Sequence, residues 1–405
     1  MSTSRLTITR RTALRAGALL PTLAMPGLLR AQPAAVKIGV LQPLTGALAQ
    51  DGDLGRLGAT LAAEAINGAG GIQALGGAKV ELVVADARSN PEAAVQEVEK
   101  LQAEGVVAIV GGFASPICLA ASQAAARYDL PYIVDVGVSD QITARGLRNT
   151  FRFAPGFGMV TGTALENLVR LNDAAGKPCK TVVLVHEDGL FGSGLARLLQ
   201  AELPKRGFEV LETIAHPTPA RDMSNVALRI RSLRPDLVIP SSYYGEFVLL
   251  ARTMRQQRIR PKGIYAVLNG AASNYRFVKE FPDAADAVMD CNHWHDPRSE
   301  EAKALKAKVD ADGRLWAYNV PLNYSCVKLV ADAVGRAGAA DRNKVIEALA
   351  TSDFSGHILP YGPTKFVNGQ NQGAAPVNTQ VQGGDIKVIF PDAFADAKPV
   401  FPVQG

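Results

Sequence analysis

A serine in a glycine-rich segment is the clearest candidate for chemistry in this sequence. Residues 111–116 read Gly-Gly-Phe-Ala-Ser-Pro and lie between an apolar run and a stretch with helical spacing. Serine is a common helix-capping residue and proline suits the first helical turn, so Ser115 and Pro116 predict a helix start. Backbone N–H groups, the positive end of the helix dipole and the Ser115 hydroxyl would converge there, which predicts an anion site. Helix capping by Ser115, without any ligand, is the alternative.

A second loop of the same kind follows the next apolar run. Residues 134–139 read Val-Asp-Val-Gly-Val-Ser. In open sheets of parallel strands, ligands bind outside the carboxyl ends of the strands, and both loops would lie at such ends. The two loops together predict one binding site at that edge of a sheet.

Motifs for catalysis are absent from the sequence. It contains no G-x-x-x-x-G-K-[ST] phosphate loop, no G-x-S-x-G nucleophile turn, no H-E-x-x-H, and no G-x-G-x-x-G after a predicted strand. His293 and His295 flank Trp294 and could share one face of a strand, but two ligands do not make a metal site. We therefore expect neither an enzyme nor a bound cofactor or metal.

Charge is concentrated at the N-terminus. The chain has 405 residues, with 43 Lys and Arg against 38 Asp and Glu. Five arginines and no acidic residue precede residue 36, so the remainder carries 38 basic and 38 acidic side chains. A neutral body argues against nucleic acid as a partner, because nucleic-acid binding requires a basic surface. No later stretch approaches the ~18 apolar residues that span a membrane.

The first 34 residues are typical of an export signal. Arg10 and Arg11 precede a weakly apolar run at 16–29, and small residues follow at Ala31 and Ala34. A basic start, a short apolar run and a small-residue exit characterise secretory signals, and paired arginines resemble the twin-arginine type. We expect cleavage near Ala31 or Ala34 and a periplasmic mature protein. An ordinary secretory signal that contains two arginines by chance is the alternative.

Export would place the cysteines in an oxidising compartment. The four cysteines are widely spaced and include no C-x-x-C: Cys118, Cys179, Cys291 and Cys326. They could form disulfides in one of three pairings, or they could remain buried free thiols, and the sequence does not choose between these.

Strands and helices alternate along the body, which has a globular composition of 47% hydrophobic and 20% charged residues. Short apolar runs predict the strands, and apolar residues spaced three and four apart predict the helices between them. The first series of strands is predicted at residues 36–41, 80–85, 106–110 and 131–134. The series restarts with strands predicted at 181–186, 209–214, 237–240, 264–267 and 287–290. This alternation predicts an α/β fold with parallel sheets that carry helices on both faces.

The last third has too few predicted strands for a third domain of this kind. Helices are predicted at residues 300–310, 321–337 and 341–350, and a tail rich in Gly, Asn and Pro follows from residue 355. The simplest interpretation is that these elements complete the two earlier halves. The chain would then pass between two lobes more than once.

Several short motifs follow one another in a characteristic order. They are Lys-Ile-Gly-Val-Leu at 37–41, Pro-Leu-Thr-Gly at 43–46, Ala-Ile-Asn at 65–67, Gly-Gly-Ile at 70–72, Asp86, Asn-Pro at 90–91, the loop at 111–116, and Gly-Leu-Phe-Gly at 189–192. This order resembles the type I periplasmic solute-binding proteins, and among them the branched-chain amino-acid receptors (Leu/Ile/Val-binding proteins) of ABC transporters. The resemblance covers essentially the whole body.

The resemblance implies two Rossmann-like lobes with parallel central sheets, three crossing segments and a ligand cleft between the lobes. The crossings would fall near Phe153, near residues 292–295 and near residues 356–360. An N-terminal lobe would hold residues 35–153 and about 293–356, and a C-terminal lobe would hold residues 154–292 and about 357–405. Residues 1–34 would form the signal peptide.

The resemblance also implies which residues bind the ligand. Ser115, with Ala114 beside it, matches the serine that holds the ligand carboxylate. Val136 and Gly137 match the second loop, and Val138 replaces a threonine that would supply a hydroxyl. The apolar and aromatic wall would come from Val138 and from three further residues: Phe191, Tyr243 and Tyr318.

Asn269 is the sharpest departure from the family pattern. Amino-acid receptors place an acidic residue there, opposite the ligand ammonium. Asparagine carries no charge, and a buried ammonium without a counter-charge is costly. Asp51, at the cleft mouth, or Glu246, at a predicted helix start, could compensate. We therefore expect a carboxylate ligand without an α-amino group, either an aromatic acid or a branched 2-oxo acid.

The expected function is thus a periplasmic receptor that delivers a small organic acid to the membrane permease subunits of an ABC importer. A monomer is expected. An ordinary branched-chain amino-acid receptor is the first alternative. A ligand-sensing domain of a signalling system and an unrecognised enzyme are alternatives of another class, although the catalytic motifs that an enzyme would need are missing.

Overall fold

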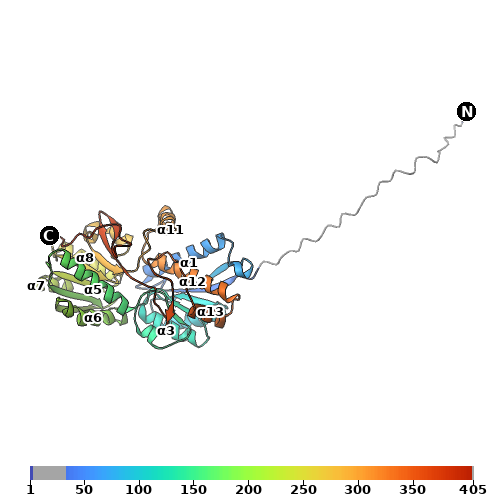
Figure 1. The fold of residues 1–405 in the computed structure, drawn as a ribbon, viewed down its shortest axis with the longest axis horizontal. Helices are drawn as coiled ribbons and strands as arrows, with labels where there is room; N and C mark the ends of the chain where they lie inside the picture. Colours follow the sequence, from blue (N-terminus) through green and yellow to red (C-terminus); the bar gives the residue numbers. More distant parts are fainter. Residues whose placement is uncertain (3–32, 404–405) are drawn as a thin grey trace. The chain divides into compact units, whose positions relative to one another are not determined.

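The computed structural model of the chain describes residues 1–2 and 33–403, and Figure 1 shows the fold. Residues 3–32 of the predicted export signal, with the arginine pair and the proposed cleavage position at Ala31, lie outside the described residues. Within the described part of the chain, no helix is both long and apolar enough to cross a membrane. The body from Pro33 onward is one compact unit with two lobes.

The described residues form two seven-stranded sheets, one in each lobe. The first sheet has the order β11-β12-β5-β4-β3-β1-β2. Its strands are β1 (Val36–Gln42), β2 (Val80–Asp86), β3 (Ala108–Gly111), β4 (Tyr132–Val134), β5 (Thr150–Arg152), β11 (Phe366–Val367) and β12 (Gln370–Asn371). All neighbours pair in parallel except β11 and β12. The carboxyl ends of β3 and β4 are therefore side by side, as the alternation in the sequence predicts.

The second sheet has the order β14-β13-β10-β9-β8-β6-β7. Its strands are β6 (Thr181–Glu187), β7 (Glu209–His216), β8 (Leu237–Ser241), β9 (Gly263–Val267), β10 (Met289–Asn292), β13 (Val377–Gln382) and β14 (Asp385–Phe390). The first five strands are parallel, and β13 pairs antiparallel with both β10 and β14. The predicted α/β class with two parallel-dominated lobes is confirmed.

Helices flank both sheets (Figure 1). Those between the early strands and near the end of the chain are α1 (Ala49–Gly68), α2 (Pro91–Ala103), α3 (Ser115–Ala126), α4 (Gln141–Ala144), α11 (Glu300–Ala311), α12 (Asn319–Ala337) and α13 (Arg342–Ala350). Those of the middle of the chain are α5 (Phe157–Ala174), α6 (Leu190–Glu202), α7 (Ser224–Leu233), α8 (Tyr244–Gln256), α9 (Tyr275–Glu280) and α10 (Pro282–Ala285). Capping fixes several starts: Asn90 accepts from the Ala93 amide and precedes Pro91, the first residue of α2.

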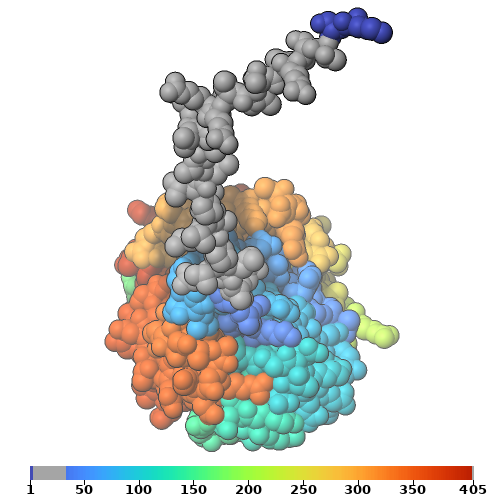
Figure 2. Space-filling view, turned by 90° about the vertical axis from the view of Figure 1, so that its right-hand side faces the viewer, coloured from blue at the N-terminus to red at the C-terminus, as the bar shows by residue number. Residues whose placement is uncertain are grey.

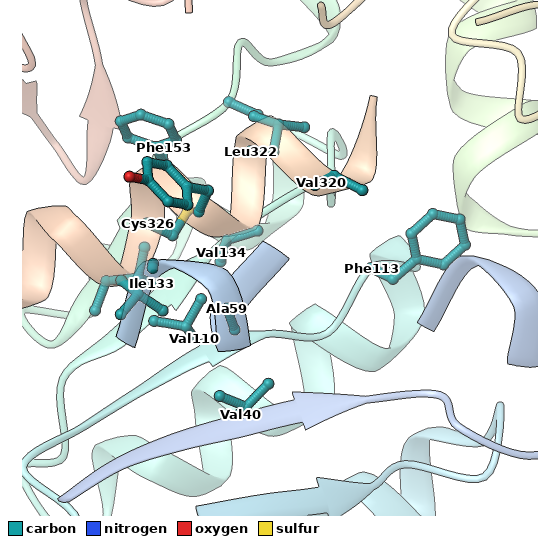
Figure 3. Close-up of a cluster of buried hydrophobic side chains, with 14 of the residues drawn as sticks. Val40, Ala59, Val110, Phe113, Ile133, Val134, Phe153, Val320, Leu322 and Cys326 are labelled. Atoms are coloured by element: carbon teal, nitrogen blue, oxygen red, sulfur yellow. The ribbon is translucent and has the colours of Figure 1, made fainter. Parts of the chain in front are cut away.

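Helix α12 returns late in the sequence to pack along α1 in the first lobe. Figure 3 shows side chains of both helices over the strands, with Ala59 from α1 next to Val110 and with Val320 and Cys326 on α12. Gly58 lets the two helices approach closely, since a Cβ there would overlap the carbonyl oxygen of Val320. In Figure 2 the orange surface of α12 and α13 lies beside the blue and cyan surface of the early segments. The prediction that late helices complete the first lobe is confirmed for α12 and α13.

The third crossing between the lobes is later than expected. Strands β11 and β12 belong to the first sheet, so the chain leaves that lobe after Asn371, not near residues 356–360. Each of these strands has only two residues and lies in a Gly- and Asn-rich tail, so no alternating pattern could reveal them. The Asn371 side chain donates to the carbonyl of Phe153, so the first and third crossings are in contact (3.0 Å).

All four cysteines lie in the described body, and all are buried free thiols. The sequence left open whether the cysteines form disulfides or remain free, and in the structure they are free. Burial raises the pKa of the Cys118, Cys291 and Cys326 thiols well above the ordinary value. These thiols are therefore protonated and unreactive at neutral pH.

Candidate ligand-binding site

A pocket lies between the two lobes. Residues from both lobes and from the second crossing line it: Phe113, Ser115, Val136, Val138, Phe191, Tyr243, Leu268, Gly270, Asn292, His293 and Tyr318. Six of these were predicted from the sequence, namely Ser115, Val136, Val138, Phe191, Tyr243 and Tyr318. The other four predicted residues, Ala114, Gly137, Asn269 and Asp51, do not line it.

The first loop turns sharply into helix α3. Gly111, Gly112 and Phe113 all have positive φ, at 125°, 104° and 57°. A Cβ at Gly111 would overlap the carbonyl oxygen of Leu41 in the neighbouring strand, so glycine is required there on both grounds. The Phe113 amide donates to Asp135 Oδ1 (2.9 Å), which fixes the turn from the next strand. Phe113 is thereby placed in the cavity wall.

Ser115 is the first residue of α3, not its cap. Ala114 is the N-cap and contributes no side-chain bond, so the alternative, in which Ser115 serves only as a helix cap, is wrong. The Ser115 hydroxyl instead accepts from the Ser139 amide in the second loop (3.2 Å). Amides in the first turn of a helix have no acceptor within the helix, and no side chain caps α3. The combination of hydroxyl, amides and helix end that favours an anion is therefore present.

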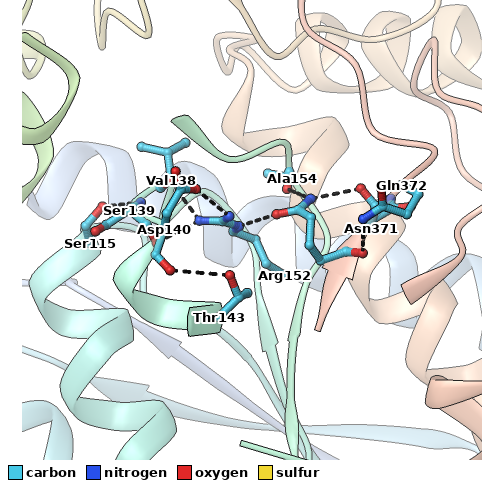
Figure 4. Close-up of polar contacts among 10 residues, drawn as sticks. Ser115, Val138, Ser139, Asp140, Thr143, Arg152, Ala154, Asn371 and Gln372 are labelled. Atoms are coloured by element: carbon cyan, nitrogen blue, oxygen red, sulfur yellow. Dashed lines mark hydrogen bonds and ion pairs between the residues drawn. The ribbon is translucent and has the colours of Figure 1, made fainter. Parts of the chain in front are cut away.

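Arg152 holds the second loop in place, as Figure 4 shows. Its guanidinium is almost fully buried and donates to the carbonyls of Val138 (2.8 Å) and Ser139 (2.7 Å). It also donates to Asp140 Oδ1 (2.9 Å) and to Gln370 Oε1 (2.6 Å). Burial lowers the pKa of Arg152, and the charge of Asp140 opposes that change. One side chain thus ties the second loop to the first and third crossings.

Aromatic rings form one wall of the cavity. The Tyr243 ring centroid lies 5.8 Å from that of Phe113 and 5.2 Å from that of Phe191. Phe191 follows the start of α6, and Tyr243 is the N-cap of α8, so both stand at the carboxyl-end edge of the second sheet. Val138 packs in the same apolar cluster as Phe191. Rings from both lobes therefore meet across the cavity.

Asn269 is fully buried, and its side chain supports its own turn. Its Oδ1 accepts from the amides of Ala271 (2.9 Å) and Ala272 (3.2 Å). Its Nδ2 has no partner in the described part of the chain, and its neighbours Leu268 and Gly270 line the cavity. Contact between Asn269 and a ligand stays a prediction.

Two acidic side chains are buried close to the cavity without lining it. Burial raises the pKa of Asp51 to about 7, an effect opposed by the Asn319 side chain and increased by the negative charge of Glu246 in the other lobe. Burial also raises the pKa of Asp290 to about 7, although Asn292 and Ser273 donate to its carboxylate. Both acids are therefore partly protonated near neutral pH.

Asn292 and His293 line the cavity but were not predicted as ligand-binding residues, although the expected second crossing includes both. Asn292 is the last residue of β10, and His293 follows it at the second crossing. The predicted strand ended two residues early, at 290, so the edge position of this pair was missed. Asn292 donates to Asp290 Oδ2 and to the carbonyl of Asn269, each at 2.9 Å. Extending the predicted strand by two residues, one period of a β-strand, would have placed both residues at the edge of the sheet where the ligand is expected.

The two histidines that flank Trp294 have different surroundings. His293 lines the cavity, whereas His295 Nδ1 accepts from the Trp316 indole nitrogen (3.1 Å). Among the described residues, no three His, Cys, Asp or Glu side chains are grouped as metal ligands.

Comparisons with known proteins agree with this architecture. Residues 35–384 match the family model described as periplasmic binding protein. The Leu/Ile/Val-binding protein homolog 7 of Brucella melitensis is 28% identical over 373 residues, which cover 89% of this chain and 92% of that protein.

Two solved structures share the fold and differ in their ligands. A solute-binding protein of a Rhodopseudomonas palustris ABC transporter, in complex with benzoate, has a TM-score of 0.76 and 22% identity, and covers 92% of this chain and 100% of its own. The substrate-binding protein LivJ of Streptococcus pneumoniae, in complex with isoleucine, has a TM-score of 0.73 and 23% identity, and covers 88% of this chain and 100% of its own. With the family match over most of its length, the chain belongs to the periplasmic binding proteins, in the type I group of the branched-chain amino-acid receptors.

Proposed function

We propose that this protein is an exported receptor of an ABC importer that binds a small carboxylate without an α-amino group in the cavity between its lobes. The observation that carries the proposal is the composition of the cavity wall. None of the described residues that line it is Asp, Glu, Lys or Arg, and its one histidine, His293, is uncharged because burial lowers its pKa to about 3. An amino acid would bury an ammonium group there without a counter-charge at contact distance, and that burial is unfavourable.

The carboxylate end of the ligand is assigned to Ser115 and the start of α3. A hydroxyl and backbone amides give charge-assisted hydrogen bonds to an anion, and the helix dipole favours negative charge at this end. The Ser139 amide already uses Ser115 Oγ as an acceptor, which leaves the hydroxyl proton for the ligand.

The remainder of the ligand is assigned to the apolar wall. Phe113, Phe191 and Tyr243 offer ring faces, and Val138 and Leu268 offer aliphatic surface. An aromatic acid or a branched 2-oxo acid fits this lining, because each has a carboxylate at one end and an apolar body. The benzoate complex of the Rhodopseudomonas palustris relative supports the aromatic choice.

A branched-chain amino-acid receptor is the second candidate. Asp51 favours it, because its Oδ1 is buried without a hydrogen-bond partner in the described part of the chain. Asp51 and Glu246 could supply the missing counter-charge if the cleft accommodated the ligand nearer to α1. The isoleucine complex of LivJ supports this alternative.

Calorimetric titration of the purified protein with leucine, 4-methyl-2-oxopentanoate and benzoate decides between the two. We expect one of the acids to bind about 10- to 100-fold more tightly than leucine. Tighter binding of leucine than of both acids would restore the amino-acid assignment. Chemical conversion of any of the three would contradict a receptor without catalytic activity.

The cellular setting is part of the proposal. The chain would be exported to the periplasm, lose its first 31 to 34 residues, and act as a monomer that presents the closed, loaded form to permease subunits. Closure around the ligand would raise the melting temperature by mass action.

A further inference from the structure

His293 is a buried polar side chain that the assignment above leaves without a role. It is fully buried at the second crossing and lines the cavity. Its Nε2 has no hydrogen-bond partner in the described part of the chain. Buried polar atoms in proteins are nearly always hydrogen-bonded, so an unpartnered imidazole nitrogen at a cavity wall indicates a group that a ligand satisfies.

The charge state of this histidine restricts what that group is. Burial lowers the pKa of His293 to about 3, so the ring is neutral at any physiological pH. A neutral imidazole has one N–H donor and one acceptor nitrogen. Its Nδ1 lies 3.4 Å from the Tyr361 hydroxyl, which can serve as donor or acceptor. A ligand hydroxyl matches Nε2 in either tautomer, because a hydroxyl also both donates and accepts.

His293 and the anion loops come from different elements of the cavity wall. The ring nearest to it in the cavity is Tyr318, with centroids 6.2 Å apart, whereas Phe113, Phe191 and Tyr243 form a separate ring group. Ser115 comes from the start of α3 and His293 from the end of β10. The cavity therefore has two polar positions on separate elements, one suited to an anion and one suited to a neutral oxygen.

We propose that His293 is a specificity-determining residue that binds a hydroxyl group of the ligand, so that the natural ligand is a hydroxylated carboxylic acid. This proposal rests on the proposed function, because the same cavity must hold the carboxylate. It goes further by naming a second recognition point and the substituent that it selects. Acids with and without the hydroxyl then differ at one contact only.

Paired titrations of the full mature protein test this assignment. The probes are benzoate with 3- and 4-hydroxybenzoate, and 4-methylpentanoate with 2-hydroxy-4-methylpentanoate. We expect at least one hydroxylated acid to bind about 10-fold more tightly than its parent. In His293→Phe, which keeps a ring but removes both nitrogens, that preference should fall to within about 2-fold.

Two further variants control the result. His293→Gln keeps a neutral side chain that donates and accepts, and it should retain part of the preference. His357→Phe makes the same replacement in a half-buried ring outside the cavity lining, and it should keep the full preference. Melting curves establish that each variant is folded, and if His293→Phe is not, the wild type and His293→Gln still decide the question.

The outcomes separate this proposal from the one on which it rests. Binding of parent and hydroxylated acids with equal affinity would overturn the role of His293 and leave the carboxylate receptor intact. Retention of the preference in His293→Phe would do the same. Failure of every acid to bind the wild type would overturn both.

Discussion

At the scale of single residues, Ser115 carries the first prediction. Its hydroxyl accepts from the Ser139 amide and adjoins the cavity, while it plays no part in capping α3. Ser115→Ala should weaken the binding of a small acid by about 10-fold or more, since a charge-assisted hydrogen bond is lost. The free energy of unfolding should fall by only about 1 kcal/mol, for the one amide left unpaired. Calorimetry and urea unfolding measure the two effects.

Ser232→Ala is the matched control, because Ser232 is exposed on α7 and its hydroxyl donates to the Arg229 carbonyl of the same helix. Ser232→Ala should change neither the affinity for acids nor the free energy of unfolding. If Ser115→Ala bound acids as the wild type does, the anion site would have to be moved to another part of the molecule.

Asn269 gives the second prediction at this scale. Because its Oδ1 accepts from two amides of the turn, aspartate can replace it without loss of those bonds. Asn269→Asp should therefore stay folded and place a carboxylate beside the cavity-lining residues Leu268 and Gly270. The preference for acids over leucine should narrow or reverse, as paired titrations would reveal. An unchanged ratio of the affinities for acids and for leucine would show that the side chain at position 269 does not influence which ligand binds.

The sequence identifies some residues of the site far better than others. Ser115 and Val138 follow short apolar runs and glycines, and such local signals mark the carboxyl ends of strands. His293 and Asn292 carry no local signal of that kind, because their position depends on where β10 ends and on a crossing between lobes. Leu268 and Phe113 are ordinary apolar residues in sequence, and only the close approach of the lobes makes them wall residues.

At the scale of elements, the close contact between α1 and α12 depends on Gly58, which has no side chain. A Cβ at position 58 would overlap the Val320 carbonyl oxygen, which belongs to the helix backbone and cannot move alone. Gly58→Ala should therefore separate the helices and lower the free energy of unfolding by about 1–3 kcal/mol. Gly68→Ala, in the same helix with no atom near its Cβ position, should be neutral or stabilising.

Urea unfolding of both glycine variants tests this packing argument. A stabilised Gly58→Ala protein would mean that the helices tolerate a wider separation than the structure has.

The Arg152 contacts are the second element-scale feature with a measurable consequence. Lysine keeps the charge of Arg152 but cannot reach the Val138 and Ser139 carbonyls, Asp140 and Gln370 together, because it lacks the planar fork. Arg152→Lys should weaken acid binding by about 10-fold through a loosened second loop, and it should lower the free energy of unfolding by about 2–4 kcal/mol. Calorimetry and urea unfolding report these changes.

Arg148→Lys offers the comparison, since Arg148 is exposed and pairs with Asp129 on the surface. Arg148→Lys should change the free energy of unfolding by no more than about 0.5 kcal/mol. Full acid affinity in Arg152→Lys would argue that the second loop keeps its shape without the guanidinium.

At the scale of the whole molecule, buried acids should make stability depend on pH. Burial raises the pKa of Asp51 and of Asp290 to about 7 in the folded protein, well above the value of an unfolded chain near 4. The folded state then holds more protons between pH 4 and pH 7, so each acid contributes stability that is present at low pH and lost as pH rises through 7. Over this range, each group lowers the free energy of unfolding by on the order of 1 kcal/mol per pH unit.

Asp51→Asn should remove one such contribution. The difference in the free energy of unfolding between variant and wild type, measured in urea from pH 4.5 to 8, should grow with pH in favour of the variant. A flat difference for Asp51→Asn would mean that the Asp51 carboxyl titrates as it does in the unfolded chain.

The two-lobed fold is the level at which sequence reasoning succeeds best. Strands such as Thr181–Glu187 are long apolar runs bounded by helices, and their number and order suffice to predict two parallel sheets. The tail is different, because β11 and β12 pair through two residues each and are held by side chains far away in sequence. Long-range contacts of that kind leave no periodic signal, and so the third crossing was placed about a dozen residues too early.

The position of β12 also has a consequence for the order in which the molecule can be assembled. Arg152 and Gln370 are 218 residues apart in sequence, and their hydrogen bond joins neighbouring strands of one sheet. A ribosome that has completed the first five strands has therefore not yet made the edge that covers them, and it makes the five parallel strands of the second sheet first. Until residue 371 has emerged, the nascent first lobe presents β5 as an open strand edge, which other chains could pair with. We expect truncation after residue 365 to give a protein that aggregates, since it exposes the edges of both β5 and β10, even though every residue of the cavity wall would be present.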